Sequence, residues 1–312
     1  MKDSFSITPA LRTKLIELAD KYESQFALED DPCQFMHRDY SIADKEVVAL
    51  IASSLAFGRR DQIISHITII LEHIASSDSE LTHKSPSEWI RTGTYKKLFH
   101  NSKKSFYRIF SQRDMLHFCD TLRVILLSNV TLGSYYKREY EKKCGVVPLY
   151  KIICQSFADK QKSCGTLIPQ TETSACKRVQ LFLRWMVRGV NCKNFSYETC
   201  TNLDGTPKCL LCKKNKDPNK LSPVDLALWT WYDKRNLLVP LDTHVIQEAV
   251  KFGLLPKTAS GKMPGATIQM AQLLTDEMKT VWPDDPAKAD FALFGLGIDV
   301  IKTQQLPTVN YR

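Results

Sequence analysis

Apolar residues recur at helical spacing along nearly the whole chain, and this pattern constrains the fold more than any other feature. Residues 9–26 begin with a proline in the first turn and carry apolar side chains three and four positions apart. The same spacing returns in residues 61–74 and 114–128. No alternating apolar and polar segment is longer than about five residues. The chain is therefore predicted to be all-α.

Local residues indicate where several of these helices begin and end. Asp44 is a suitable N-cap for a helix through Phe57, and Gly58 then follows the end of that helix. Pro86 stands just inside another helix start. Residues 30–32, Asp-Asp-Pro, are expected to break the first helix.

The positive charge of the chain is concentrated in its middle. The 312 residues carry 43 basic and 34 acidic side chains, a net charge of +9. Residues 84–221 hold 26 basic and 10 acidic side chains, whereas residues 1–83 hold 8 and 14 and residues 222–312 hold 9 and 10. Such a block favours a polyanionic partner, and nucleic acid is the commonest large one. The alternative is a solubilising surface without a partner.

Neither a membrane span nor a secretory signal is expected. The longest run that leans apolar, residues 47–58, is too short to cross a bilayer. An acidic residue, Asp3, follows the start at once, and no apolar segment comes behind it. Six of the ten cysteines stand singly, which is unlike a secreted disulfide framework. A reducing, cytoplasmic location is therefore expected, at the nucleoid if the source is bacterial.

Lys177 is the first candidate for a reactive side chain. It lies in residues 173–188, where Ser174 is a suitable N-cap and would make Lys177 the third helical residue. The positive end of the helix dipole, together with Arg178 and Arg184, would disfavour the charged ammonium form. A lysine with a free amine is a nucleophile that can form a Schiff base. The alternative is an ordinary surface or phosphate-binding lysine.

Asp242 is the second candidate. An apolar segment, residues 237–241, leads to this carboxylate at a helix start, and the helix is expected to run to Phe252 with Gly253 as its stop. N-capping alone would explain an aspartate here. A carboxylate held in a partly desolvated position can also act as a base or stabilise a cation, and one residue can serve both purposes. His244 has no evident metal-ligand partners nearby, so we expect it to be structural or to face phosphate.

Residues 189–221 differ from the rest of the chain, because they are polar, rich in lysine and poor in helical periodicity. We interpret them as an insertion between two helical segments. The insertion holds four cysteines: Cys192, Cys200, Cys209 and Cys212. Only the last two have the tight spacing of a thiolate metal site. One structural zinc, an iron–sulfur cluster and unliganded thiols all remain open. A metal would give order to a segment too short to build its own core.

Lys177 and Asp242 together resemble the reactive pair of the helix-hairpin-helix (HhH-GPD) DNA glycosylase superfamily. Residues 241–245, Leu-Asp-Thr-His-Val, are similar to its V-D-T-H-V segment at the head of a helix. Residues 44–62 resemble its first barrel helix and the DNA-inserting turn that follows. Residues 290–297 resemble its last helix, which packs behind the aspartate.

More closely, the chain from about residue 28 to 300 is similar to a largely bacterial family that resembles the archaeal 8-oxoguanine DNA glycosylases. The shared segments are Asp31-Pro32, Phe35-x-His37-Arg38, Lys177-Arg178 and Pro240-Leu241-Asp242-Thr243-His244. In the archaeal enzymes the lysine is closer to the aspartate along the chain, and the insertion accounts for the difference. No cysteine follows Gly297, so the iron–sulfur module of the superfamily is not expected.

The resemblance implies a two-lobed, all-α glycosylase fold. Residues 44–188 would form the helical barrel lobe and residues 223–312 the C-terminal helical lobe. Residues 189–222 would be the Cys-rich insertion with its junction, and residues 1–43 would return to pack with the C-terminal lobe. DNA would lie across the cleft between the lobes, with the basic block along one wall.

The function implied is base excision from DNA with strand nicking by β-elimination (AP lyase activity). Lys177 would attack the sugar of a flipped nucleotide, and Asp242 would stabilise the developing positive charge or move the proton. Damaged duplex DNA would be the partner, with no membrane and a monomeric protein. Contacts to the nucleic acid would come from Arg59, Arg60, Arg178, Arg184 and His244. The alternatives are a non-catalytic nucleic-acid-binding protein on the same scaffold, which needs neither Lys177 nor Asp242, and a zinc-organised interaction module.

Overall fold

The computed structural model describes residues 7–23, 31–76, 85–158, 167–169, 173–189, 222 and 224–304, with the backbone alone for residue 295 and residues 298–304. These parts of the chain are mostly helical, which confirms the all-α prediction at the level of fold class. The α-helices are α1 (Pro9–Tyr22), α2 (Ile42–Leu55), α3 (Arg60–Ala75), α4 (Pro86–Thr92), α5 (Gln112–Leu127), α6 (Leu132–Lys142), α7 (Leu149–Ala158), α8 (Lys177–Val187), α11 (Thr243–Lys251), α12 (Ile268–Met278) and α13 (Ala289–Gln304). Four 3₁₀ turns are η2 (Pro32–His37), η3 (Thr94–Lys97), η5 (Lys234–Asn236) and η6 (Pro286–Lys288).

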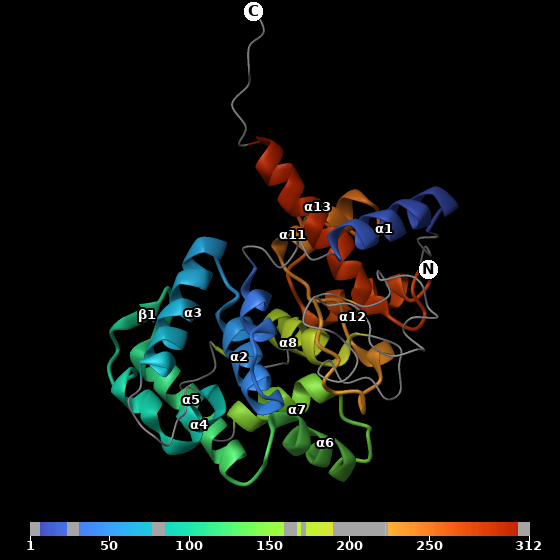
Figure 1. The fold of residues 1–312 in the computed structure, drawn as a ribbon. Coiled ribbons are helices and arrows are strands. Elements are labelled where there is room, and N and C mark those ends of the chain that lie inside the picture. Colours follow the sequence, from blue (N-terminus) through green and yellow to red (C-terminus); the bar gives the residue numbers. More distant parts are fainter. Residues whose placement is uncertain are drawn as a thin grey trace, which may run out of the picture.

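Helix α2 lies near the centre of the molecule, between two groups of helices (Figure 1). Every residue from Asp44 to Leu55 is buried, as expected of a helix that is covered on all sides. It contacts η2, α3, α4, α6 and α8. Helix α13 packs against both α1 and α11, so the two ends of the described chain lie together (Figure 1).

The ends of the helices depart from the local signals in several places. Helix α1 stops at Tyr22, before the predicted residue 26. Ser41, and not Asp44, caps α2, since the Ser41 hydroxyl accepts from the backbone N–H of Asp44 at 3.2 Å. The Asp44 carboxylate instead accepts from the Ser85 hydroxyl and the Ser87 N–H at the start of α4. Asp44 therefore joins two helices, and a tertiary contact has taken the place of the expected cap.

A short hairpin, β1 (Ser105–Tyr107) and β2 (Phe110–Ser111), is the one sheet in the described residues and had no signal in the sequence. Its turn places Arg108 in the left-handed region, with φ 51°. The Tyr107 hydroxyl donates to the carbonyl of Phe57, and the Arg108 guanidinium lies over the Phe57 ring. The hairpin thus supports the turn between α2 and α3.

A buried carboxylate links α2 to α6 and to the chain after the insertion. Glu46 Oε1 accepts from the indole N–H of Trp229 at 2.7 Å and from the Gly133 N–H at 3.1 Å. A Cβ on Gly133 would lie 2.5 Å from Trp229 Nε1, so only glycine permits this approach. Burial raises the pKa of Glu46 to about 7, although the N–H groups of Trp229 and Gly133 oppose the shift.

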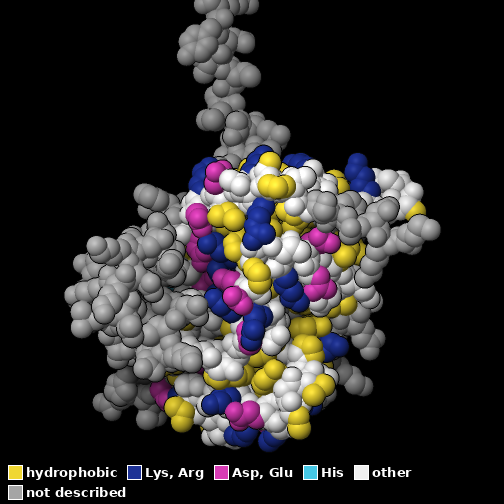
Figure 2. Space-filling model, turned by 90° about the vertical axis from the view of Figure 1, so that its right-hand side faces the viewer, with side chains coloured by type: hydrophobic (Ala, Val, Ile, Leu, Met, Phe, Trp, Pro, Cys, Tyr) yellow, Lys and Arg dark blue, Asp and Glu magenta, His cyan; other side chains and the backbone are white. Residues whose placement is uncertain are grey.

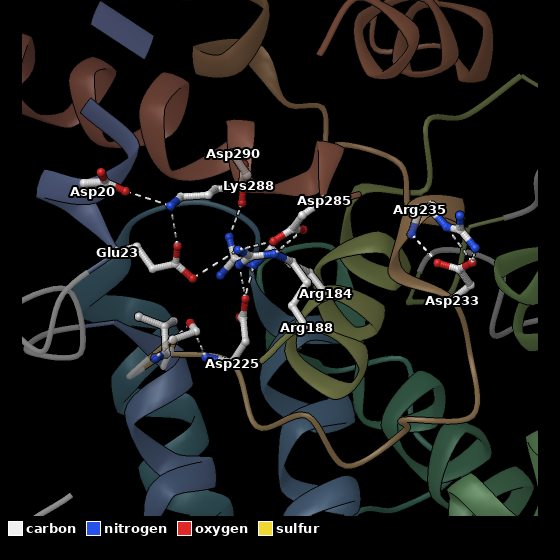
Figure 3. Close-up of polar contacts among 12 residues, drawn as sticks. Asp20, Glu23, Arg184, Arg188, Asp225, Asp233, Arg235, Asp285, Lys288 and Asp290 are labelled. Carbon is white, nitrogen blue, oxygen red and sulfur yellow. Dashed lines mark hydrogen bonds and ion pairs between the residues drawn. The ribbon is translucent and has the colours of Figure 1, made fainter. Parts of the chain in front are cut away.

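A second buried polar cluster fastens α8 to the C-terminal helices (Figure 3). Arg184 pairs with Asp225 at 3.3 Å and with Asp290. Arg188 pairs with Glu23 at 3.0 Å, with Asp285 at 2.7 Å and with Asp225. The two guanidinium groups are almost fully buried, so these carboxylates are needed to compensate their charge. The cluster thus ties the C-terminal end of α8 to the end of α1 and to the start of α13.

Within the described ranges no single helix is long and apolar enough to cross a membrane. Helices α5 and α6 reach the required length and composition only as a pair, and they meet at a 77° bend.

Candidate active site

Lys177 is the first residue of α8. The residue before it, Cys176, occupies the N-cap position with φ 53° and makes no side-chain capping bond. Ser174 is not the cap, because the chain at this point pairs with a distant segment. Ser174 lies opposite Thr267 in an isolated β-bridge, and the Ala175 N–H donates to the carbonyl of Ala266 at 3.0 Å. The expected third position of Lys177 is thus corrected to the first.

Asp242 caps α11, as the sequence predicts, and its carboxylate accepts from the Val245 N–H at 2.9 Å. The apolar segment that leads to it is buried, and the Val239 N–H donates to the Thr275 hydroxyl at 3.0 Å. Behind it α11 lies close to α13, where a Cβ on Gly297 would come within 3.4 Å of the Cβ of His244. The carboxylate is therefore held in a fixed position.

The side chains of Lys177 and Asp242 meet. Lys177 Nζ lies 3.0 Å from Asp242 Oδ2, and the two side chains are 29% and 16% exposed. The ring of Phe294, on α13, lies with its centre 5.8 Å from Lys177 Nζ. The pair is thus shielded on one side and still reachable by a ligand.

Burial and the surrounding charges shift the pKa of Asp242 and that of a nearby acid, Asp290. Burial alone would raise the pKa of Asp242, but the Lys177 charge and the Val245 N–H outweigh it and hold this pKa below its ordinary value. Asp290, which is buried, has its pKa raised to about 6 by burial and by the Asp242 charge, against the opposing charges of Arg184 and Lys177. Asp242 therefore loses its proton more easily than an ordinary aspartate does, and Asp290 loses its proton less easily.

Three of the residues expected to contact nucleic acid lie at or near the surface. Arg59 is 77% exposed and pairs with Asp61 at 2.8 Å. Arg60 is half-buried at the first position of α3, and His244 is half-buried beside Asp242. Of these three, only His244 lies close to Lys177 or Asp242 in the chain.

The other two arginines have internal roles. Arg178 donates to the Ser54 carbonyl at 3.2 Å and lies over the ring of Phe110, and burial lowers its pKa to about 10. Arg184 is in the buried cluster of Figure 3 and presents no surface to a phosphate. The prediction that Arg184 contacts phosphate is therefore wrong. Acidic residues distant in sequence surround its guanidinium and form structural ion pairs with it.

Figure 2 shows the face on the right-hand side of Figure 1, where basic and acidic side chains are interspersed with apolar ones. The basic excess is not gathered into one positive patch on the described part of this face.

The cysteines proposed as metal ligands, Cys192, Cys200, Cys209 and Cys212, lie outside the described residues. Among the residues that are described, no group of three or more His, Cys, Asp and Glu side chains is placed to hold a metal ion.

The sequence did not point to two residues that the structure places near Lys177 and Asp242. Phe294 and Asp290 both lie on α13, one turn apart; the Phe294 ring lies beside Lys177, and Asp290 interacts electrostatically with Asp242 and Lys177. Their only signal was the resemblance of residues 290–297 to the last helix of the glycosylases, which identified the helix and not the side chains.

The comparisons with known proteins give one match. Residues 31–195 and 217–299 match the family described as "Protein of unknown function (DUF2400)". No curated protein and no solved structure matches the chain. Since the matched residues make up well over half of the 312, the chain belongs to the DUF2400 family.

Proposed function

We propose that the protein is a DNA glycosylase that releases a damaged base and then nicks the strand by β-elimination. The observation that carries the proposal is the 3.0 Å approach of Lys177 Nζ to Asp242 Oδ2 from two different helix starts. The resemblance to the helix-hairpin-helix glycosylases assigns these same two residues the roles of nucleophile and carboxylate.

In this reaction the amine of Lys177 attacks C1′ of the damaged nucleotide. A C–N bond forms to the lysine while the bond from C1′ to the base breaks, and the base leaves with the bonding electrons. The lysine must lose its proton to attack, and Asp242 is placed to accept it. The bound nitrogen then expels the ring oxygen O4′, which takes up a proton as the C1′–O4′ bond breaks. The resulting iminium activates C2′, which loses a proton as the 3′ phosphate departs. Water then releases the sugar fragment and restores Lys177.

The charge distribution supports a nucleic-acid substrate. Lys177 lies within the basic block, residues 84–221. An enzyme that acts at C1′ needs the nucleotide outside the base stack, and the partial exposure of both side chains leaves them reachable by such a nucleotide. The ring of Phe294 beside Lys177 adds apolar surface, which favours the departure of water from the site.

Borohydride trapping tests the proposal, since hydride reduces the iminium to a stable amine bond between protein and DNA. Wild-type protein should give a covalent adduct with a duplex that carries an abasic site or a suitable damaged base. Lys177→Gln should give none while its affinity for DNA stays nearly unchanged. Lys251→Gln, a change at an exposed lysine of α11, should trap as wild type does.

A wild-type protein that binds DNA and traps nothing on any lesion would contradict the proposal. It would favour the non-catalytic nucleic-acid-binding protein instead.

A further inference from the structure

Two buried cysteines face each other at the base of α8. Cys154 Sγ, from the middle of α7, lies 4.0 Å from Cys176 Sγ, and neither residue is more than 1% exposed. Cys176 directly precedes Lys177 in the chain. No part of the proposed reaction uses either sulfur.

The backbone of Cys176 is in a conformation that L-residues seldom adopt. Its φ of 53° lies in the left-handed region, where a residue other than glycine is strained. The Ser174 hydroxyl accepts from the Cys176 N–H at 3.1 Å, and Cys176 Sγ lies 3.4 Å from the Ser174 carbonyl oxygen. The surrounding chain therefore holds this thiol toward α7.

The two thiols differ in their environments. Hydrogen bonding from the Cys154 thiol lowers the pKa of Cys176, and the Ser174 contact and the Arg178 charge act in the same direction against burial. That same hydrogen bond, together with burial, raises the pKa of Cys154. Of the two thiols, Cys176 therefore loses its proton more easily than Cys154 does, which is the order expected of an attacking and a resolving cysteine.

We propose that Cys154 and Cys176 are a reversible redox site, which a small peroxide converts to a disulfide that moves Lys177 away from Asp242. Cys176 attacks hydrogen peroxide, breaks the O–O bond and becomes a sulfenic acid, and its proton leaves with the departing oxygen as water. Cys154 then attacks the Cys176 sulfur and expels a second water. Two thiols are oxidised and one peroxide is reduced to two waters.

The geometry explains why Lys177 would respond. A disulfide needs its sulfurs about 2 Å apart, so they must approach each other by about 2 Å. Cys154 is held in the middle of α7, whereas Cys176 lies at the N-cap of α8 in a strained backbone conformation, and only its carbonyl joins the helical hydrogen bonds, accepting from the Gln180 N–H at 2.9 Å. The shift therefore falls on Cys176 and on Lys177, the next residue. A displacement of about 1 Å is enough to break a hydrogen-bonded contact of 3.0 Å.

The burial of both sulfurs selects the oxidant. We expect a molecule the size of hydrogen peroxide to reach them beside Lys177, whose side chain is 29% exposed. Glutathione disulfide is too bulky to reach a sulfur with no more than 1% exposure.

The first test is chemical and uses the full chain without DNA. After treatment with hydrogen peroxide and alkylation, peptide mapping should find Cys154 and Cys176 cross-linked, and dithiothreitol should reverse the link. Glutathione disulfide should not produce it. Cys33, equally buried and beside Asp31, should be alkylated once the protein is denatured without reduction and should form no link. A protein in which the two sulfurs stay unlinked overturns the proposal.

The second test reads the position of Lys177 by reductive methylation. Oxidation should raise the methylation of Lys177 by about threefold, because release from Asp242 frees a partly exposed amine. Lys279, which pairs with its near neighbour Asp276 and is far from Lys177 in the sequence, is the internal reference, and its methylation should not change. In Cys154→Ala, which leaves the start of α8 intact, peroxide should have no effect on Lys177. A cross-link that forms without any change at Lys177 contradicts the proposed effect.

The effect of the disulfide on catalysis rests on the proposed function, so it is tested in a separate experiment. If the reduced protein traps an abasic site, oxidation should lower the yield at least tenfold and dithiothreitol should restore it. If the reduced protein traps nothing, the glycosylase proposal fails, and the mapping and methylation results still decide the redox proposal.

Discussion

Lys177 Nζ and Asp242 Oδ2 lie 3.0 Å apart at the point where the starts of α8 and α11 converge. A helix start carries partial positive charge, so a lysine in the first turn of α8 is unfavourable by itself. Asp242 compensates that charge and at the same time caps its own helix. A lysine at a helix start lowers stability unless a carboxylate such as Asp242 compensates its charge. Unfavourable placements of this kind are common at sites where the reaction needs both groups.

Asp242→Asn separates the catalytic role of this carboxylate from its capping role. Asn is also a good N-cap and the ion pair is partly exposed, so the free energy of unfolding should fall by no more than about 1 kcal/mol. Base release should slow by a factor of about 100 or more, because the proton acceptor is lost. Urea unfolding and single-turnover base release provide the two measurements. Asp233→Asn is the matched control, since Asp233 also caps a turn and pairs with a basic residue. Equal rates for both variants would leave only the capping role.

Arg188→Met tests the buried ion cluster. The change removes one compensating charge from Glu23 and Asp225 and the cationic partner of Asp285, so the protein should lose about 3–5 kcal/mol of unfolding free energy. Arg235→Met removes an exposed arginine that pairs with Asp233 and should produce no measurable change. Denaturant unfolding of the two variants compares them directly. Similar losses in both would show that burial of the cluster is not what stabilises α8.

Glu46 should make stability depend on pH near neutrality. Its pKa is raised from 4.5 to about 7 in the folded protein, so the folded state binds the proton more tightly than the unfolded chain does. The contribution is complete below pH 4.5 and is lost as the pH rises to about 7. Across that window wild type should lose on the order of 3 kcal/mol relative to Glu46→Gln, whose amide oxygen can still accept from Trp229 and Gly133. Parallel pH profiles of the two unfolding free energies would contradict this.

The insertion predicts a bound metal. Purified protein should carry about one zinc ion per chain, and the double change Cys209→Ser and Cys212→Ser should remove it. Elemental analysis of metal content gives the answer independently of any activity. Protein without metal and with four freely titrating thiols in this segment would show that the cysteines are unliganded.

The helices could be predicted because their signal is local. The apolar spacing of residues 61–74 and 114–128 matches α3 and α5 to within a few residues, since burial of one face follows directly from that spacing. Their ends were less predictable. Asp44 has the properties of a cap, yet its carboxylate bonds to Ser85 and Ser87, which lie about forty positions away.

The site could be predicted only in part for the same reason. Lys177 and Asp242 stand out by their chemistry, but the start of α8 depends on the pairing of Ser174 with Thr267, which no local pattern reveals. Arg184 lies two turns beyond Lys177 and carries the positive charge expected of a residue that binds phosphate. Its burial depends on Asp225 and Asp290, contributed by separate parts of the chain.

The identity of the lysine in the borohydride-trapped adduct tests the central claim most directly. Wild-type protein trapped on an abasic-site duplex would be digested with nuclease and protease, and mass spectrometry would locate the remaining sugar fragment. The account predicts that the fragment is bound to Lys177 alone. A fragment on another lysine or on the N-terminal amine, or the absence of any adduct from reduced wild-type protein, would contradict it.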